Sequence, residues 1–315
     1  MVSGAGLIGL TPHRIASDSL IVEVVPYGAS LIGVWHRDSS NLVLRLPTSE
    51  MLDHHRNPHL GAIAGRFANR IASARFILDG VEHELIANNG ANTLHAGPTG
   101  FSRRTWTVLD AGGHFVRLQL VSGDGDQGFP GRLVAEVDYS VDGEALSITT
   151  SASTDAPTVV SLANHAYWNL AGSGTIDDHL LTVDAPSFVE VDDALIPTGR
   201  LLPVDGTPFD LRHPSTIGDL DNCLVGPGGS VGSDGVTAQL VHPASGRSMY
   251  VTTDLPGLQV YAGLHLGDPF VARGAVCLEA QQLPDAPNQP TFPSAVLRPD
   301  ETDRHVTVHR FALAD

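Results

Sequence analysis

Short apolar runs rich in Val, Leu, Ile and Thr recur along the whole chain, and Gly and Pro residues separate them. This pattern is typical of β-strands, and helical periodicity is hard to find. Residues 76–85 predict two strands joined at Asp79-Gly80, a dipeptide that tight hairpins favour. Residues 115–120 alternate as a half-buried strand does, and residues 305–311 predict a C-terminal strand that closes a sheet. We therefore expect an all-β fold, a large antiparallel β-sandwich.

A single domain is expected over residues 1–315, because a large β-sandwich can reach this length as one unit. No shift in composition divides the chain. Residues 226–235 are Gly-rich and polar and are the strongest linker candidate, but strand-like sequence resumes directly after them. They predict a surface loop and not a domain boundary.

The overall charge narrows the class of partner. The formal net charge is −17, which argues against nucleic acid or an anionic membrane surface as a partner. No stretch approaches 18 uninterrupted apolar residues, so no membrane span is expected. The first ten residues lack the positive charge of a signal peptide, and a cytoplasmic protein is the expectation. A small neutral ligand is compatible with all of this, and the oligomeric state is left open.

All 18 basic residues are arginine, because the chain contains no lysine. This absence excludes Schiff-base catalysis, pyridoxal-phosphate attachment and the lysine of a phosphate-binding loop. The two cysteines, Cys223 and Cys277, lack metal-ligand spacing and predict buried free thiols. Residues 124–128 resemble a calcium loop only faintly, without the distal glutamate, and predict a turn. We therefore expect no metal and no cofactor.

Histidine is abundant, at 15 copies, so local context has to identify the functional ones. His54, His55 and His59 lie in a polar segment with an Asn-Pro turn, which predicts a solvated loop and not a metal site.

Three other segments interleave hydrogen-bonding groups with aromatic or apolar side chains, the mixture that binds sugars. They are residues 65–71 with 88–97, residues 164–170 and residues 278–290. Each has a simpler structural explanation: Arg66 as an ion-pair residue, Trp168 as core and Glu279 as a solvated strand end.

The same segments resemble, in order, the motifs of the aldose 1-epimerase family. Gly65-Arg66-x-x-Asn69-Arg70-Ile71 resembles its arginine motif, and Asn92-Thr93-Leu94-His95 its histidine loop. Asn164-His165-Ala166-Tyr167-Trp168-Asn169-Leu170 is similar to its second histidine motif, and Leu278-Glu279-x-Gln281 with Pro284-Asp285-Ala286-Pro287-Asn288 to its glutamate motif. The resemblance extends from about residue 28 to about residue 310. It implies a galactose mutarotase-like supersandwich that interconverts the α and β anomers of free hexoses such as glucose or galactose, without a cofactor.

Mutarotation needs a base on the anomeric hydroxyl and an acid on the ring oxygen, with the roles reversed on reclosure. The resemblance assigns the base to Glu279 and the acid to His165, with His95 as a second donor near the ring oxygen. It also implies a substrate-binding set of Arg66, Asn69, Asp221 and Gln281. Within this set, Arg66 and Asp221 are expected to hold hydroxyl groups of the sugar.

Three positions depart from the family pattern. The histidine loop of the family usually carries two glycines after its histidine, whereas here Ala96 precedes Gly97, and Leu264 stands where the family often has Asn. The segment around Asp221 matches only loosely, so Asp219 is a rival for the sugar-binding carboxylate. These departures bear on which hydroxyl pattern is accepted more than on the reaction.

Two alternative functions on the same fold are considered. A hexose-6-phosphate 1-epimerase would gather several arginines around a phosphate, and Arg103-Arg104 is a possible start. A non-catalytic sugar-binding module would lack the acid or the base, whereas His165 and Glu279 are both present in matching motifs. A lyase or glycosidase is less well supported, because no clear second carboxylate partners Glu279.

Overall fold

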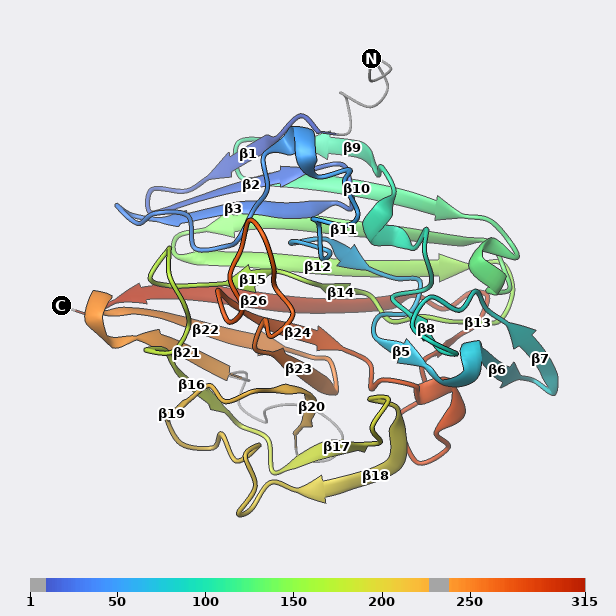
Figure 1. Cartoon of the computed structure of the whole chain (residues 1–315). Coiled ribbons are helices and arrows are strands. Elements are labelled where there is room, and N and C mark those ends of the chain that lie inside the picture. The colour runs from blue at the N-terminus through green and yellow to red at the C-terminus, as the bar shows by residue number, and fades with distance from the viewer. Residues whose placement is uncertain (1–9, 227–237, 315) are drawn as a thin grey trace.

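The computed structural model describes residues 10–226 and 238–314, which form strands and short 3₁₀ turns (Figure 1). The predicted all-β antiparallel sandwich is confirmed. Most of the predicted loop at residues 226–235 lies outside the described residues. The assignment of residues 1–315 to one domain stays a prediction.

The largest sheet has nine strands, and its long members β10, β11, β12 and β26 run side by side across the molecule (Figure 1). From edge to edge the order is β19 (Ser215–Thr216), β16 (Leu180–Val183), β21 (Ala238–His242), β22 (Arg247–Thr253), β26 (Asp303–Leu313), β12 (Ala145–Thr154), β11 (Leu133–Asp142), β10 (Phe115–Ser122) and β9 (Thr107–Ala111).

A six-stranded sheet and a three-stranded sheet complete the main layers. The first has the order β15 (Tyr167–Trp168), β24 (Val276–Gln281), β23 (Gly257–Tyr261), β20 (Asp221–Val225), β17 (Ser187–Val191) and β18 (Pro197–Pro203). The second has the order β1 (His13–Ala16), β2 (Leu20–Val25) and β3 (Ser30–His36).

Short two-stranded pairs and 3₁₀ turns lie outside these sheets. The two-stranded pairs are β13 (Thr158–Val159) with β25 (Val296–Leu297), β14 (Ala163–Asn164) with β4 (Ile63–Ala64), β5 (Arg70–Ile71) with β8 (Thr93–Leu94), and β6 (Arg75–Leu78) with β7 (Val81–Glu84). The 3₁₀ turns are η1 (Thr48–Glu50), η2 (Ala72–Ala74), η3 (Phe101–Arg103), η4 (Asp126–Gly128), η6 (Pro243–Ser245) and η7 (Ala286–Asn288).

One buried apolar cluster joins the three main sheets. It combines Leu118 and Val137 of the nine-stranded sheet with Leu258 and Leu278 of the six-stranded sheet and Leu31 of the three-stranded sheet. Each sheet buries one face in this cluster, which is the packing that a sandwich requires.

The predicted hairpin at residues 76–85 is confirmed. Strands β6 and β7 pair around Asp79 and Gly80, whose φ angles of 51° and 82° are those of a tight hairpin turn. The C-terminal strand differs from the expectation of closing a sheet: β26 lies inside the nine-stranded sheet, between β12 and β22. Its buried side chains are His309 and Phe311. Among the described residues, no helix is long and apolar enough to cross a membrane.

Strand β24 carries the alternation that positions the candidate site. Val276, Leu278 and Ala280 point into the main cluster, so Cys277 and Glu279 point to the opposite face of the sheet. All six residues of the strand are buried, so its second face is covered as well.

A buried histidine on β26 predicts acid sensitivity. Burial lowers the pKa of His309 to about 4, and its ring packs against Trp168 at 5.0 Å between centroids. The unfolded chain binds a proton near pH 6.5 and the folded protein only near pH 4, so acidification favours unfolding. His309→Gln should flatten the fall in unfolding free energy between pH 6.5 and 4 by roughly 1.4 kcal/mol per pH unit, measured by urea denaturation.

The matched control is His55→Gln, because His55 is exposed. This variant should keep the wild-type slope. Equal slopes for the wild type and His309→Gln would contradict the prediction.

Candidate active site

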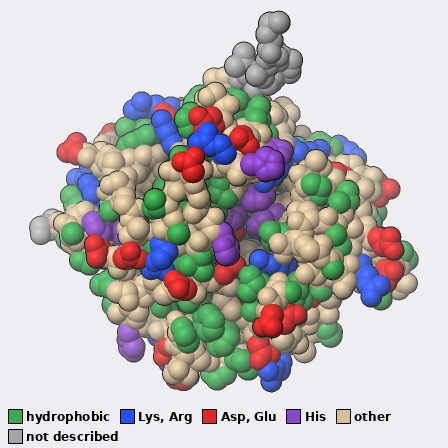
Figure 2. All heavy atoms as spheres, in the orientation of Figure 1, with side chains coloured by type: hydrophobic (Ala, Val, Ile, Leu, Met, Phe, Trp, Pro, Cys, Tyr) green, Lys and Arg blue, Asp and Glu red, His purple; other side chains and the backbone are tan. Residues whose placement is uncertain are grey.

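A cavity of about 240 Å³ opens over the outer face of the six-stranded sheet. Figure 2 shows histidine side chains gathered in a hollow near the centre of the view. The histidines that line the cavity are His59, His95, His165 and His265. The rings of the first three lie 4.9 to 5.9 Å apart, and Tyr167 continues this aromatic wall at 5.1 Å from His165.

Three neighbouring strands supply the floor. Glu279 of β24 lies directly opposite Gln259 of β23, and Asp221 of β20 lies opposite Tyr261 at the end of β23. Because paired residues of adjacent strands share a face, these four side chains all reach the cavity.

The segments that carry β5 and β8 form one side of the cavity. Strands β5 and β8 pair so that the backbone N–H of Asn69 donates to Nδ1 of His95 at 3.1 Å. Since Nδ1 accepts, the proton of neutral His95 sits on Nε2, which becomes a donor. Asn69 and His95 have φ angles of 66° and 49°, so both turns of the loop adopt the left-handed conformation.

An amide chain links this loop to the floor. The side-chain amide of Asn69 donates to Oε1 of Gln259 at 3.1 Å, and that of Gln259 donates to Oδ1 of Asp221 at 2.6 Å. The Arg70 guanidinium lies 4.0 Å from the other oxygen of Asp221. The network holds a carboxylate, two amides and a cation at one end of the cavity, a set suited to sugar hydroxyls.

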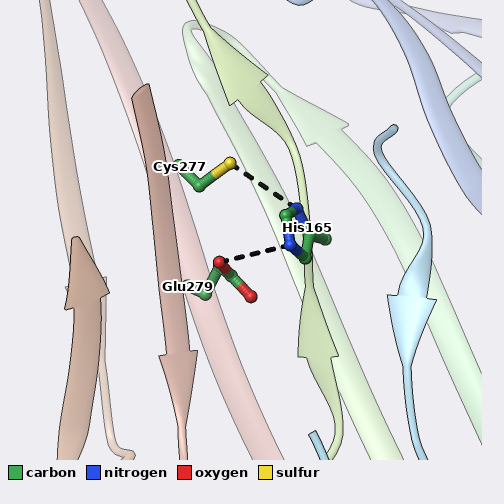
Figure 3. A group of neighbouring side chains, drawn as sticks. All are labelled: His165, Cys277 and Glu279. Carbon is green, nitrogen blue, oxygen red and sulfur yellow. Dashed lines mark hydrogen bonds and ion pairs between the residues drawn. The ribbon is translucent and has the colours of Figure 1, made fainter. Parts of the chain in front are cut away.

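Next to this network, Oε1 of Glu279 lies 3.6 Å from Nε2 of His165 (Figure 3). Both side chains are buried. Behind the imidazole, Sγ of Cys277 lies 3.5 Å from Nδ1. The acid/base candidates therefore face each other at one edge of the cavity, 3.6 Å apart.

Burial shifts both candidates toward their neutral forms. It raises the pKa of Glu279 well above the usual carboxyl value, and the charge of Asp221 adds to this, while Arg70 opposes it. Burial lowers the pKa of His165 to about 4, partly offset by its own backbone carbonyl. It also lowers the pKa of His95, as do the neighbouring His59 and His165.

Known proteins identify the family to which the chain belongs. The family model described as Aldose 1-epimerase matches residues 13–310. The chain belongs to the aldose 1-epimerase family.

Relatives and solved structures extend this membership over nearly the whole chain. The galactose mutarotase of Homo sapiens is 38% identical, covering 99% of this chain and 96% of that protein. The aldose 1-epimerase of Escherichia coli is 35% identical over 80% of each. The crystal structure of an aldose epimerase homologue from C. elegans superposes with a TM-score of 0.92 at 32% identity, covering 97% of this chain and 99% of that one.

The position of Arg66 differs from the expected one, in which this residue binds substrate. Its side chain is 1% exposed and does not line the cavity. The guanidinium instead donates to the carbonyls of Pro130 and Gly131 at 2.7 and 2.9 Å and to Oγ of Ser122 at 2.6 Å. The arginine that lines the cavity is Arg70, which the same sequence motif contains.

Gln281 is the second correction. It is fully buried and lies opposite Gly257, one same-face step along β24 from Glu279 and outside the cavity lining. Gln259 of the neighbouring strand lines the cavity in its place. The sequence motif could not reveal this, because the pairing of β23 with β24 decides it.

The structure also separates the two aspartates. Asp221 lines the cavity, whereas Asp219 has an exposed side chain paired with Arg273 at 3.0 Å. His59, which was expected in a solvated loop, lines the cavity and bonds Oγ of Ser102 through Nδ1 at 2.8 Å. The other expected site residues all line the cavity: Glu279, His165, His95 and Asn69.

Two of the three departures from the family pattern lie at positions that the structure describes as follows. Ala96 has a φ of 61°, so an alanine occupies a left-handed position that favours glycine. Leu264 packs against the main apolar cluster and does not line the cavity.

The two arginines should respond differently to removal. Arg66→Met leaves several buried carbonyls without a donor and should lower the free energy of unfolding by about 3 kcal/mol or more. Arg70→Met should raise KM for the sugar and leave stability nearly unchanged, because Arg70 faces the cavity. Urea denaturation and polarimetric kinetics on both variants test this; a raised KM in folded Arg66→Met with a normal KM in Arg70→Met would contradict it.

Proposed function

We propose that the chain interconverts the α and β anomers of a free hexose, with Glu279 and His165 as the acid/base pair. The observation that carries the proposal is the separation of 3.6 Å between Oε1 of Glu279 and Nε2 of His165 at the cavity wall. The anomeric oxygen and the ring oxygen are bonded to the same carbon, so two groups this close together can serve both oxygens of one sugar.

In the forward half-reaction the Glu279 carboxylate takes the proton of the anomeric hydroxyl. His165, protonated, gives a proton to the ring oxygen as the C1–O5 bond breaks, and the open-chain aldehyde results. Rotation about C1–C2 turns the other carbonyl face to the ring oxygen. Reclosure returns each proton to its starting group, so the enzyme regains its initial state after each event.

The pair holds one transferable proton throughout this cycle. With the ring closed and ready to react, Glu279 is ionised and His165 is charged; with the ring open, both are neutral. Burial favours the neutral pair, as the raised pKa of Glu279 and the lowered pKa of His165 indicate. The environment therefore stabilises the protonation state that accompanies ring opening.

The remaining polar groups support an orienting role. The Nε2 of His95 is available as a donor near the acid, while Arg70, Asp221 and Gln259 gather beside Glu279 in the cavity wall. Held hydroxyls would fix the ring with its anomeric carbon at the acid/base pair, a contribution of proximity.

A free sugar is better supported than a sugar phosphate. Arg70 is the arginine among the described residues that line the cavity, and its charge faces Asp221. Arg104 is paired with Asp126, and neither it nor Arg103 lines the cavity. The relatives named above are a galactose mutarotase and an aldose 1-epimerase, names that refer to free sugars.

Removal of either acid/base group should abolish most of the activity. Glu279→Gln and His165→Gln are each expected to lower kcat by roughly 10²–10⁴-fold, the usual range for a lost general acid or base. Polarimetry on freshly dissolved α-D-glucose and α-D-galactose measures the rate, after subtraction of the spontaneous reaction.

The control is His265→Gln, which changes a cavity histidine away from the pair and should keep kcat within a few-fold. Wild-type rates in either variant would contradict the assignment of Glu279 and His165 as the acid/base pair. A preference of the wild type for glucose 6-phosphate over glucose would favour the phosphate alternative.

The acid limb of the pH profile should report His165. Below about pH 4 the His165 imidazole becomes protonated while Glu279 stays protonated. The pair then holds two protons, and no base is left. We expect kcat/KM to fall below about pH 4, and the His165 ring to titrate at the same pH by NMR. Titration of His165 near pH 6.5 would contradict this prediction.

A further inference from the structure

His59 is a third imidazole of the cavity, and the acid/base cycle does not use it. Its ring lines the cavity and lies 4.9 Å from the ring of His95 and 5.9 Å from the ring of His165. Its φ angle is 64°, in the left-handed region that residues other than glycine adopt rarely. A backbone of this kind persists only where the surrounding structure fixes it, and such positions are frequent in binding sites.

Backbone hydrogen bonds tie the segment of His59 to that of His165. The N–H of Ala62 donates to the carbonyl of His59 at 3.0 Å and closes a turn. The N–H of Gly61, inside this turn, donates to the carbonyl of His165 at 2.9 Å. In return, the N–H of His165 donates to the carbonyl of Ala62 at 2.8 Å. The turn that carries His59 is therefore held directly against the segment that carries the candidate acid.

One nitrogen of the His59 ring is left for a ligand. Nδ1 bonds Oγ of Ser102 at 2.8 Å, and Ser102 is buried and does not line the cavity. Within residues 10–226 and 238–314, no side chain is hydrogen-bonded or ion-paired to Nε2. Burial and the nearby charges of His165 and Arg103 lower the pKa of His59, so its ring is neutral. A hydroxyl can donate or accept, so it can bond Nε2 in either tautomer.

The charged groups around the cavity show on which side of the acid/base pair His59 lies. Asp221 contributes to the raised pKa of Glu279, and its amide partner Gln259 lies opposite Glu279 on the neighbouring strand. The charges that act on the pKa of His59 are instead those of His165 and other basic groups. His59 therefore lies on the His165 side of the pair, and the Asp221 network lies on the Glu279 side.

This arrangement gives a bound sugar a direction. In the proposed reaction Glu279 serves the anomeric hydroxyl on C1, and His165 serves the ring oxygen. The ring oxygen is bonded to C1 and to C5, and in a hexose C5 carries the exocyclic C6 hydroxyl. Apart from the anomeric hydroxyl, this is the hydroxyl closest to the ring oxygen. With C1 at Glu279, it lies on the side of the histidines.

We propose that Nε2 of His59 binds the C6 hydroxyl of the sugar, so that the site prefers aldohexoses to sugars that lack this hydroxyl. The proposal rests on the function given above, which sets the direction of the ring. A site that hydrogen-bonds a substrate hydroxyl discriminates against the analogue without it, because the polar group of the protein is then left unpaired.

Polarimetry on a pair of sugars tests the contact. D-galactose and 6-deoxy-D-galactose differ only in the C6 hydroxyl. For the wild type, kcat/KM should be about 3- to 10-fold lower with the deoxy sugar, the equivalent of one hydrogen bond between neutral groups. His59→Asn should lower kcat/KM for galactose by a similar factor, chiefly through KM, and leave the value for the deoxy sugar unchanged. Asn suits this position because it tolerates the left-handed conformation, while its side chain is shorter.

Two further variants complete the comparison. His59→Phe keeps a ring beside His95 and His165 but has no ring nitrogen, and it should lose the same discrimination between the two sugars. His55→Asn changes an exposed histidine of the same segment that does not line the cavity, and it should keep the wild-type ratio.

The ratio of the two sugars separates hydrogen bonding from packing. A lost packing contact lowers kcat/KM for both sugars alike, whereas a lost hydrogen bond affects only the sugar that carries the hydroxyl. A wild-type ratio near one, or an equal fall for both sugars in the folded His59 variants, would overturn the proposal. A crystal structure of the wild type with galactose needs no variant: it should show Nε2 of His59 hydrogen-bonded to the C6 hydroxyl, and a C6 hydroxyl bound elsewhere would equally overturn it.

Failure of this inference is distinguishable from failure of the proposed function. Absence of mutarotation in the wild type would overturn the proposed function. Normal mutarotation at equal rates on galactose and 6-deoxygalactose would overturn only the role of His59.

Discussion

The burial of a carboxylate against an imidazole is the constraint on which the rest of the site depends. Glu279 and His165 are both buried, 3.6 Å apart, and each charged form is costly there. A pair of this kind is stable when its two groups share one proton and can exchange it with a ligand. The surrounding strands keep both side chains buried, and the cavity that they line gives a small molecule access to them.

Much of the fold could be predicted from local pattern. The hairpin at Asp79-Gly80 followed from turn chemistry, and the all-β class followed from short apolar runs. The position of β26 inside the largest sheet could not, because strand order depends on pairings between residues far apart in the chain. Alternation along 305–311 was equally compatible with an edge and a central strand.

Site residues could be predicted where a motif contains one candidate residue of the required type. The prediction was less accurate where a motif contains two candidates of the same type. Glu279 and His165 each stand alone in their motifs. Arg66 and Arg70 lie four residues apart, and only the fold shows that the first meets backbone carbonyls and the second the cavity. Gln259 lies outside every recognised motif and reaches the cavity because β23 pairs with β24.

Strand β24 has a further consequence for how such a protein can change. Its even-numbered residues pack in the core, whereas Glu279 points to the opposite face and the cavity, so a deletion of one residue would exchange the two faces. The strand is therefore locked in length as well as in composition. The same cavity is also lined by residues outside the strands, namely His59, Asn89 and His265. Because the alternation of a strand does not constrain these loop segments, they are the places where changes could accommodate a different sugar.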